Sequence, residues 1–291
     1  MTKNPVPVKR YAMDHGLSFT ETPSHLKSLK YWTHPNKSPF DVGVVVSFGY
    51  FLYPHLLDDL KHGAINMHPS LLPKYRGPAP IHHALLNGDR TTGVSIIEID
   101  PLAFDTGRIL LQKPFPIPEN ITFQPLATSL SEFGASCVLE TLRSLPHLRE
   151  HATVQNNSQA SKAPKVRFEH GFLTFKESAI EIFQKWQTLG DSVGLSVQFK
   201  GKRVKLCKTA IPSQELMATV DQKRYQGLSP GTFFFDTQMK ALWLRCAQDS
   251  WLTIFSLQQE DRKIGEALDF VNGYRLRHKT GTFEPIDSIS K

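Results

Sequence analysis

A polar segment near the middle of the chain separates two regions with different hydrophobic periodicities. Residues 151–165, "HATVQNNSQASKAPK", have no apolar repeat and are typical of a linker. Before this segment, apolar runs typical of strands alternate with segments of helical periodicity, which predicts an α/β domain with a parallel-sheet core. After it, one helix precedes five short strands separated by turns, which predicts a small β-barrel of the OB-like type.

These periodicities predict three parts of the chain: an α/β domain over residues 1–150, a linker over 151–166 and a barrel domain over 167–291. Within the first domain, the β-branched run at 41–49 is typical of a buried parallel strand. A proline-led helix that ends at Gly16 and an alternating strand at 17–22 are expected before it.

The composition limits the class of protein and its partners. Of 291 residues, 40% are hydrophobic and 21% are charged, which is typical of a globular protein. The three cysteines lie far apart without a CxxC spacing, which argues against a disulfide framework or a zinc site. The formal net charge of +7 is concentrated after Pro164, where 19 basic residues face 14 acidic ones. A polyanionic partner such as nucleic acid is therefore compatible with the sequence, whereas no apolar run is long enough to span a membrane.

A proline-rich loop follows the apolar strand at 63–67 and begins with an amide and an imidazole. Asn66 and His68 are alternate residues, so their side chains leave the strand end on the same side. Prolines at 69, 73, 78 and 80 exclude a helix or a strand ladder across the loop. Because a rigid loop preorganises donors, the pattern favours a catalytic site, with a turn-forming Asn and a surface His as the alternative.

Asp105, in the sequence "FDTG", follows the next expected strand and should lie at the same edge of the sheet. The alternative is an ordinary turn, in which Asp and Gly are common. An aspartic protease needs two such carboxylates, and the sequence has one Asp-Thr-Gly. We therefore expect Asp105 to meet Asn66 and His68.

Two histidine pairs in the sequence are candidate metal ligands. His82 and His83 are neighbours and would point in different directions from a helix, about 100° apart. His147 and His151 have i,i+4 spacing, but the spacing alone supplies no third ligand. The sequence therefore predicts no metal site.

The region after the linker contains a basic stretch, "KGKRVK", that could bind a nucleic acid. Its cations are Lys200, Lys202, Arg203 and Lys205. Alternation along a strand would place some of them on one face, although a solvated edge strand guarded by lysines explains the pattern equally well.

The motif Asn-x-His-Pro-Ser-Leu-Leu-Pro-x-x-Arg-Gly-x-x-Pro, followed by Asp-Thr-Gly, resembles the folate-dependent formyltransferases. The stretches "RGPAPI", "GDRTTGVSI" and "SKAPKV" are similar to the branch of that family that acts on methionyl-tRNA. The likeness extends from about residue 5 to about residue 274. It implies a Rossmann-like catalytic domain followed by an OB-like domain.

The resemblance implies transfer of a formyl group from 10-formyltetrahydrofolate to the amine of initiator methionyl-tRNA, without a metal. It implies catalytic roles for Asn66, His68 and Asp105. It places the folate among Val46, Phe48, Gly49, Ser70, Leu71, Leu72 and Pro73. Arg76 is expected to be structural or to face RNA. The likeness is to mitochondrial members, so the expected location is the mitochondrial matrix, the expected role is in organellar translation initiation, and the expected state is a monomer.

The front of the chain departs from the family. Members of the family have a strand, a glycine-containing turn, a helix and a second strand before the segment that resembles "PVPVK". We therefore expect an incomplete α/β domain with an exposed apolar flank, whose edge strand lies near Leu17 or Val42. Two other hypotheses for the function stay open. One is a formyltransferase or hydrolase that acts on a small amine or folate, and the other is a truncated, inactive RNA-binding product.

Overall fold

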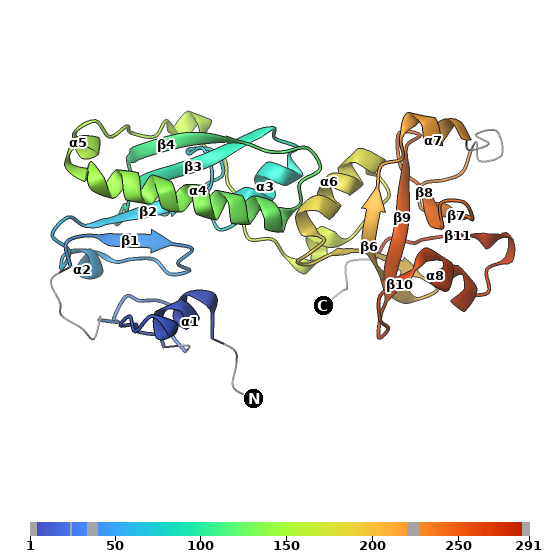
Figure 1. Ribbon diagram of the computed structural model, residues 1–291, viewed down its shortest axis with the longest axis horizontal. Helices are drawn as coiled ribbons and strands as arrows, with labels where there is room; N and C mark the ends of the chain where they lie inside the picture. The colour runs from blue at the N-terminus through green and yellow to red at the C-terminus, as the bar shows by residue number, and fades with distance from the viewer. Residues whose placement is uncertain (1–4, 24, 34–39, 220–226, 287–291) are drawn as a thin grey trace.

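The computed structural model describes residues 5–23, 25–33, 40–219 and 227–286. Figure 1 shows two lobes, one on each side of the linker. The N-terminal lobe contains a four-stranded sheet and the C-terminal lobe a seven-stranded one. Among the described residues, no helix is long and apolar enough to cross a membrane.

The N-terminal sheet has the order β1 (Gly43–Val46), β2 (Ala64–His68), β3 (Thr91–Glu98) and β4 (Ile109–Pro116). Its mixed α/β class is as expected. Only the β1–β2 pair is parallel, whereas β2–β3 and β3–β4 are antiparallel. A strand that is buried on both faces is an apolar run in either direction, so the sequence pattern carried no signal for strand direction.

Helix α4 (Phe123–Arg143) covers one face of this sheet, as Figure 1 shows. Ile65 and Met67 of β2 pack toward α4, in one core cluster with its Leu126 and Leu130. Asn66 lies between them in sequence, so its side chain leaves the opposite face. The sheet therefore separates the apolar core under α4 from the face that carries Asn66.

Shorter helices complete the N-terminal lobe: α1 (Pro7–Asp14), α2 (Pro54–Leu57), α3 (Pro80–Leu86) and α5 (Leu145–Glu150). Gly16 follows α1 with a φ of 63°, which confirms the expected helix stop. The strand expected at 17–22 is wrong, because these residues have no regular structure. Leu17 is 54% exposed and Phe19 is 48% exposed, so the alternating pattern does not bury an apolar face there.

β1 forms the edge of the sheet and pairs with β2 alone among the described residues. Val44 and Val46 leave it on one face and are 44% and 48% exposed. The expected apolar flank is therefore present, and its edge strand is the one that follows Val42.

The C-terminal lobe begins with α6 (Ala179–Leu189) and is built around an antiparallel sheet. Its strands are β5 (Leu195–Phe199), β6 (Lys202–Ala210), β7 (Thr232–Asp236), β8 (Ala241–Arg245), β9 (Trp251–Gln259), β10 (Gly265–Glu266) and β11 (Thr280–Thr282). The order is β11-β7-β8-β9-β6-β5, with β10 paired to β9. Two further helices are α7 (Gln214–Thr219) and α8 (Ala267–Gly273), and short 3-10 turns cover Asn157–Gln159, Phe168–Gly171 and Arg277–Lys279.

This sheet curls until its two ends meet. Glu284, just after β11, exchanges two backbone hydrogen bonds of 2.8 Å with Gln198 of β5. Aromatic rings fill the interior, where Phe199 lies 5.6 Å from Phe233 and 5.2 Å from Phe270 of α8 between ring centroids. The small β-barrel predicted for this part of the chain is confirmed.

The linker lies against the proline-rich loop. Arg76 donates its backbone N–H to Ser161 (2.8 Å) and accepts from the backbone N–H of Ala163 (2.7 Å). Gly77 has a φ of 123°, and a Cβ there would lie 2.7 Å from the Ala163 carbonyl oxygen. A glycine at 77 thus permits the close approach between the loop and the linker.

Candidate active site

The loop after β2 is fixed to the sheet by buried hydroxyl groups. Ser70 is fully buried and donates its hydroxyl to the carbonyl of Lys74 at 2.6 Å. Ser95 of β3 donates to the carbonyl of Ser70 (2.7 Å) and accepts from the backbone N–H of Leu72 (3.1 Å). The loop therefore provides a rigid support for the residues at the end of β2.

Asn66, His68 and Asp105 meet beside this loop, although 39 residues separate Asn66 from Asp105. The Oδ1 atom of Asp105 lies 3.5 Å from Asn66 Nδ2 and 3.5 Å from His68 Nδ1. Its other oxygen, Oδ2, accepts the backbone N–H of Gly77 at 2.8 Å. The three side chains that the sequence placed at one edge of the sheet do lie together.

Gln155, in the linker, positions the Asp105 loop and was missed by the sequence analysis. Its side-chain N–H groups donate to the carbonyl oxygens of Asp105 (2.9 Å) and Gly107 (2.8 Å). Its Oε1 atom accepts from Nε and Nη2 of Arg76, at 3.0 and 2.7 Å. Arg76 therefore supports the site through Gln155. Of the two roles expected for Arg76, structural or facing RNA, this contact is the structural one. No local motif marks Gln155, because its partners lie about fifty and eighty residues away in sequence.

His68 is 5% exposed, and an oxygen atom lies near each of its ring nitrogens. Nε2 lies 2.9 Å from the carbonyl oxygen of Tyr75. A carbonyl can only accept, so Nε2 carries the proton of the neutral ring and Nδ1 faces Asp105 with a lone pair. Burial lowers the pKa of His68, while Asp105 and the Tyr75 carbonyl act in the opposite direction. The imidazole is therefore neutral near pH 7, with Nδ1 as a proton acceptor.

The lowered pKa of His68 predicts a pH dependence of folding stability. The unfolded chain binds the proton more readily than the folded protein, so stability is retained above about pH 6.5 and is lost progressively as the pH falls below it. We expect His68→Gln to lose less stability than the unmodified protein between about pH 7.5 and about pH 5.5. Urea unfolding at the two pH values measures this difference, and identical losses in both proteins would contradict the assignment.

A small cavity of about 70 Å³ lies against Asn66 and Asp105, on the face of the sheet opposite α4. Its other walls come from the segment after β1 and the segment after β3. They include the side chains of Phe48, Tyr50, Phe51, Leu52, Asp100 and Phe104. The cavity thus combines aromatic walls with the amide and carboxylate of the site.

The residues expected to hold folate are divided between different places. Phe48 lines the small cavity, and a Cβ at the neighbouring Gly49 would meet no atom within 4 Å. Val46 lines a groove on the other face of the sheet. Ser70, Leu71, Leu72 and Pro73 do not line the small cavity. Their observed role is to hold the loop, since Ser70 and Leu72 are buried against β3.

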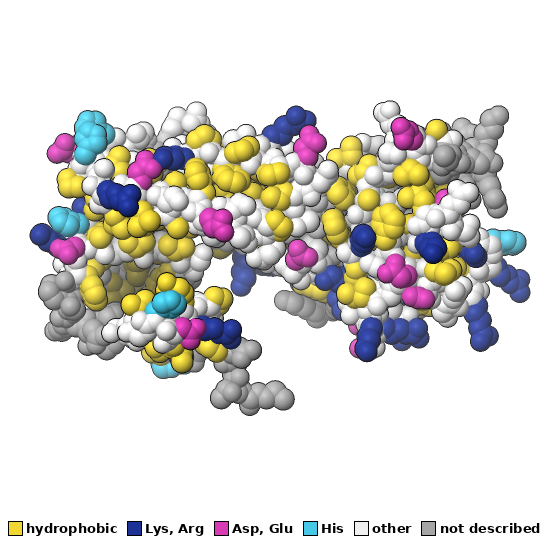
Figure 2. Space-filling model, viewed as in Figure 1, with side chains coloured by type: hydrophobic (Ala, Val, Ile, Leu, Met, Phe, Trp, Pro, Cys, Tyr) yellow, Lys and Arg dark blue, Asp and Glu magenta, His cyan; other side chains and the backbone are white. Residues whose placement is uncertain are grey.

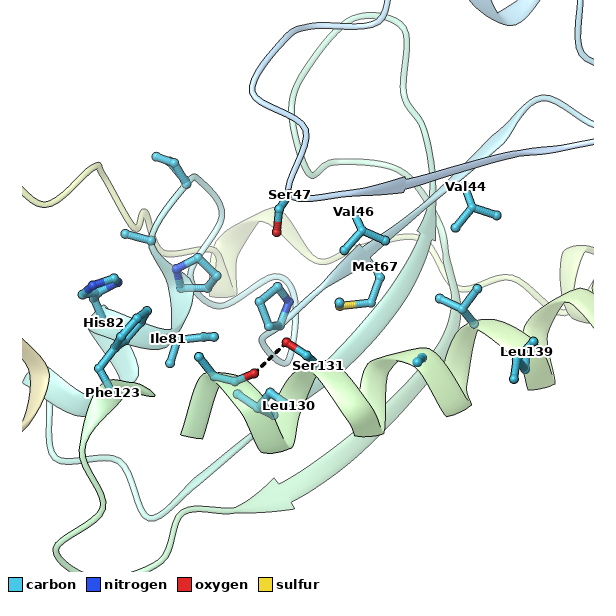
Figure 3. A pocket seen from close by; sticks show the side chains of 17 residues that line it. Val44, Val46, Ser47, Met67, Ile81, His82, Phe123, Leu130, Ser131 and Leu139 are labelled. Atoms are coloured by element: carbon cyan, nitrogen blue, oxygen red, sulfur yellow. Dashed lines mark hydrogen bonds between the residues drawn. The ribbon is translucent and has the colours of Figure 1, made fainter. Parts of the chain in front are cut away.

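The larger groove, of about 600 Å³, lies between the exposed face of β1 and helices α3 and α4. Figure 3 shows Val44, Val46 and Met67 facing Leu130 and Ser131 of α4 across it. His82 stands at one end and is stacked on Phe123, with ring centroids 3.9 Å apart. Because this groove is on the opposite face of the sheet from Asn66, it is separate from the catalytic cluster.

The basic residues of the barrel lie around the β5–β6 hairpin. Lys200 is in the turn, and Lys202 begins β6. Along β6, Val204 is buried, whereas Arg203 and Lys205 are partly exposed on the other side of the strand. The outward pair is thus Arg203 and Lys205. Figure 2 shows Lys and Arg side chains along the lower edge of this lobe.

Both lobes match models of one protein family. The formyl transferase model matches residues 21–142, and the model of its C-terminal domain matches residues 165–275. The chain therefore belongs to the formyl transferase family.

Its curated relatives include methionyl-tRNA formyltransferases of mitochondria and bacteria. The human mitochondrial enzyme is 33% identical over 271 residues, which are 92% of this chain and 66% of the relative. The chain thus spans just under two thirds of the length of that enzyme. The enzyme of Caldicellulosiruptor saccharolyticus is 31% identical, with 94% of this chain and 84% of the relative covered. That of Ehrlichia canis is 35% identical, with 94% and 88% covered.

Solved structures share the fold at lower identity. An N-formyltransferase from Helicobacter canadensis, in complex with folinic acid and dTDP-3-aminofucose, matches with a TM-score of 0.58 and 17% identity. The match covers 86% of this chain and 82% of that protein. HypX from Aquifex aeolicus, in complex with tetrahydrofolic acid, matches with a TM-score of 0.57 and 19% identity, covering 80% and 39%.

Proposed function

We propose that this protein transfers the formyl group of 10-formyltetrahydrofolate to the amino group of methionyl-tRNA. The convergence of Asn66, His68 and Asp105 beside a cavity is the observation that carries the proposal. The relatives named as methionyl-tRNA formyltransferases support it, because they cover more than nine tenths of this chain.

The small cavity, of about 70 Å³, cannot enclose the flat ring of a folate, but its aromatic rim offers the ring a surface for stacking. Phe48, Phe51 and Phe104 offer aromatic surfaces for stacking, and Asp100 offers a carboxylate to ring N–H groups. Two solved structures of this fold contain tetrahydrofolic acid or folinic acid. A folate ring stacked on this aromatic rim would have its formyl group close to Asn66 and Asp105.

In the proposed reaction, the lone pair of the acceptor amine forms a bond to the formyl carbon. The carbonyl π electrons move to the formyl oxygen, which becomes an oxyanion. Asn66 is the donor for this oxygen, since within the described parts of the chain its amide N–H group has just a 3.5 Å contact with Asp105. Collapse of the intermediate re-forms the carbonyl and breaks the bond to the folate nitrogen.

His68 carries the proton between the two nitrogens. Because Tyr75 holds the proton on Nε2, the free Nδ1 lone pair accepts the proton that the attacking amine loses. Asp105 then faces an imidazolium and stabilises its positive charge. The same proton passes to the departing folate nitrogen, which restores the neutral ring. This order gives proton acceptance to His68 and charge stabilisation to Asp105.

The barrel and its basic surface support tRNA as the acceptor. Arg203 lies with its guanidinium 5.2 Å from the ring centre of Phe168, and Lys205 leaves the same side of β6. Cations on the outward face of a strand suit the phosphate backbone, which carries no sequence information. Selection of the initiator species would then depend on contacts nearer to Asn66.

The basic surface predicts a salt dependence of tRNA binding. Changing Arg203 and Lys205 together to Gln should reduce the slope of log K against log salt by about 0.7 to 0.9 for each lost phosphate contact. Lys113→Gln, on the N-terminal lobe and paired with Glu140, is the matched control and should leave the slope unchanged. Fluorescence titrations across a salt series measure both. An unchanged slope in the double variant would assign the pair to a solvated strand.

We place the protein in mitochondria, with a role in starting organellar translation, because several of its relatives are mitochondrial enzymes. A fluorescent fusion imaged with a matrix marker tests the location. Diffuse fluorescence outside the organelle would contradict it.

A formylation assay with initiator methionyl-tRNA and 10-formyltetrahydrofolate tests the activity itself. Formylated methionyl-tRNA is the expected product. A product formed only with a small amine, or free formate without transfer, would replace tRNA with the alternative substrates. Binding of tRNA with no turnover would identify an inactive RNA-binding protein.

A further inference from the structure

We propose that His147, Glu150 and His151 form a binding site for a divalent transition-metal ion such as Zn²⁺. The three residues have the spacing i, i+3 and i+4. His147 and Glu150 are in α5, and His151 is the residue that follows the helix. Their ligand atoms lie within 4.8 Å of one another, and all three side chains are exposed. Two imidazoles and a carboxylate are a ligand set that Zn²⁺ takes in proteins, with water in the fourth position.

A second observation fixes the tautomer of one ligand. Nδ1 of His151 lies 2.9 Å from the carbonyl oxygen of His147, which can only accept. Nδ1 therefore carries the proton, and the Nε2 lone pair of His151 is free for a cation. A histidine ligand commonly has its other N–H group held by a carbonyl in this way.

The two remaining ligands are also available. In the described parts of the chain, neither the His147 ring nor the Glu150 carboxylate forms an ion pair, and neither accepts a side-chain hydrogen bond. The imidazoles are close, with ring centroids 4.4 Å apart and planes inclined at 46°. Figure 2 shows histidine side chains beside an acidic one over α5, at the upper left of the N-terminal lobe.

α5 is held firmly, so the ligands are presented by a fixed backbone. Leu145, at the start of α5, is 6% exposed and lies in the core. Arg149 forms an ion pair with Glu98, with Nε and Oε1 3.4 Å apart. Thr153, two residues after His151, exchanges backbone hydrogen bonds with Ile109 of β4 at 2.8 and 2.9 Å. Both ends of the short segment are therefore anchored, and binding an ion requires little ordering of the backbone.

The proposed metal site shares no residue with the catalytic cluster. It lies in residues 143–164, between the stretches that the two family models match. One link to the active site is the linker, which continues from Thr153 to Gln155 and the Asp105 loop. The proposal does not depend on the formyl transfer proposed above.

Titration calorimetry with ZnCl₂ at about pH 7.5, on untagged protein freed of metal by a chelator, tests the site. We expect one equivalent of Zn²⁺ to bind. The double variant His147→Ala, His151→Ala should weaken binding by at least about tenfold, and Glu150→Gln should weaken it by a smaller factor. His62→Ala removes an exposed histidine outside the cluster and should leave the affinity unchanged.

Circular dichroism on each variant verifies that the fold is retained. Glu150→Gln keeps the length of the side chain, so it supplies a folded test if the double variant is unstable. Absence of Zn²⁺ binding by the unmodified protein would overturn the proposal. So would an equal affinity in the unmodified protein, the double variant and Glu150→Gln.

Discussion

Replacing Asn66 by Ala is expected to lower kcat for formyl transfer by about 10²- to 10³-fold, the usual effect of losing one oxyanion donor. The amide lies at the end of β2, beside the cavity and 3.5 Å from Asp105. Its N–H group should be used mainly in the transition state, when the formyl oxygen becomes negative, so kcat should fall more than KM changes.

The control for this experiment is Asn272→Ala, which removes an exposed amide from α8 in the other lobe and should leave kcat unchanged. Combining Asn66→Ala with His68→Ala should cost less than the product of the two separate effects, because the residues act on one intermediate. A near-normal kcat in Asn66→Ala, with a changed KM alone, would remove Asn66 from the catalytic role.

Replacing Gly107 by Ala is expected to destabilise the protein by about 3 kcal/mol, because overpacking of this size forces the backbone to move. A Cβ at this position would lie 1.8 Å from the carbonyl oxygen of Glu98 in β3 and 2.8 Å from its carbonyl carbon. Both atoms belong to a backbone that is hydrogen-bonded to Arg108, so a side-chain rotation cannot relieve the overlap.

The displaced backbone would also disturb catalysis, because the carbonyl oxygens of Gly107 and Asp105 share the side-chain N–H group of Gln155. Urea unfolding measures the loss of stability, and the formylation assay measures the loss of kcat. Gly49→Ala is the matched control for stability, since a Cβ there would meet no atom within 4 Å. Equal unfolding midpoints for the two variants would show that the Glu98 carbonyl does not restrict residue 107.

Local sequence patterns identified most helices and strands. They failed where the formation of a strand depended on a neighbouring strand. The run at 41–49 and the alternating residues of β6 correspond to observed strands. Residues 17–22 alternate in the same way, yet they have no regular structure. A strand needs hydrogen bonds from a neighbour, and alternation within one segment does not supply that neighbour. Strand direction in the first sheet was undetermined for a related reason, since apolar runs look alike in parallel and antiparallel pairs.

By itself, the sequence determined which side chains leave the end of β2 together. The two-residue period of a strand places Asn66 and His68 on one side, and prolines 69 and 73 prevent the strand from continuing. Only the tertiary structure decided that Asp105 faces both side chains, that Tyr75 sets the tautomer of His68, and that Gln155 holds the Asp105 loop. The physical reason is range: backbone periodicity acts over a few residues, whereas these contacts require segments far apart in sequence to be packed against one sheet.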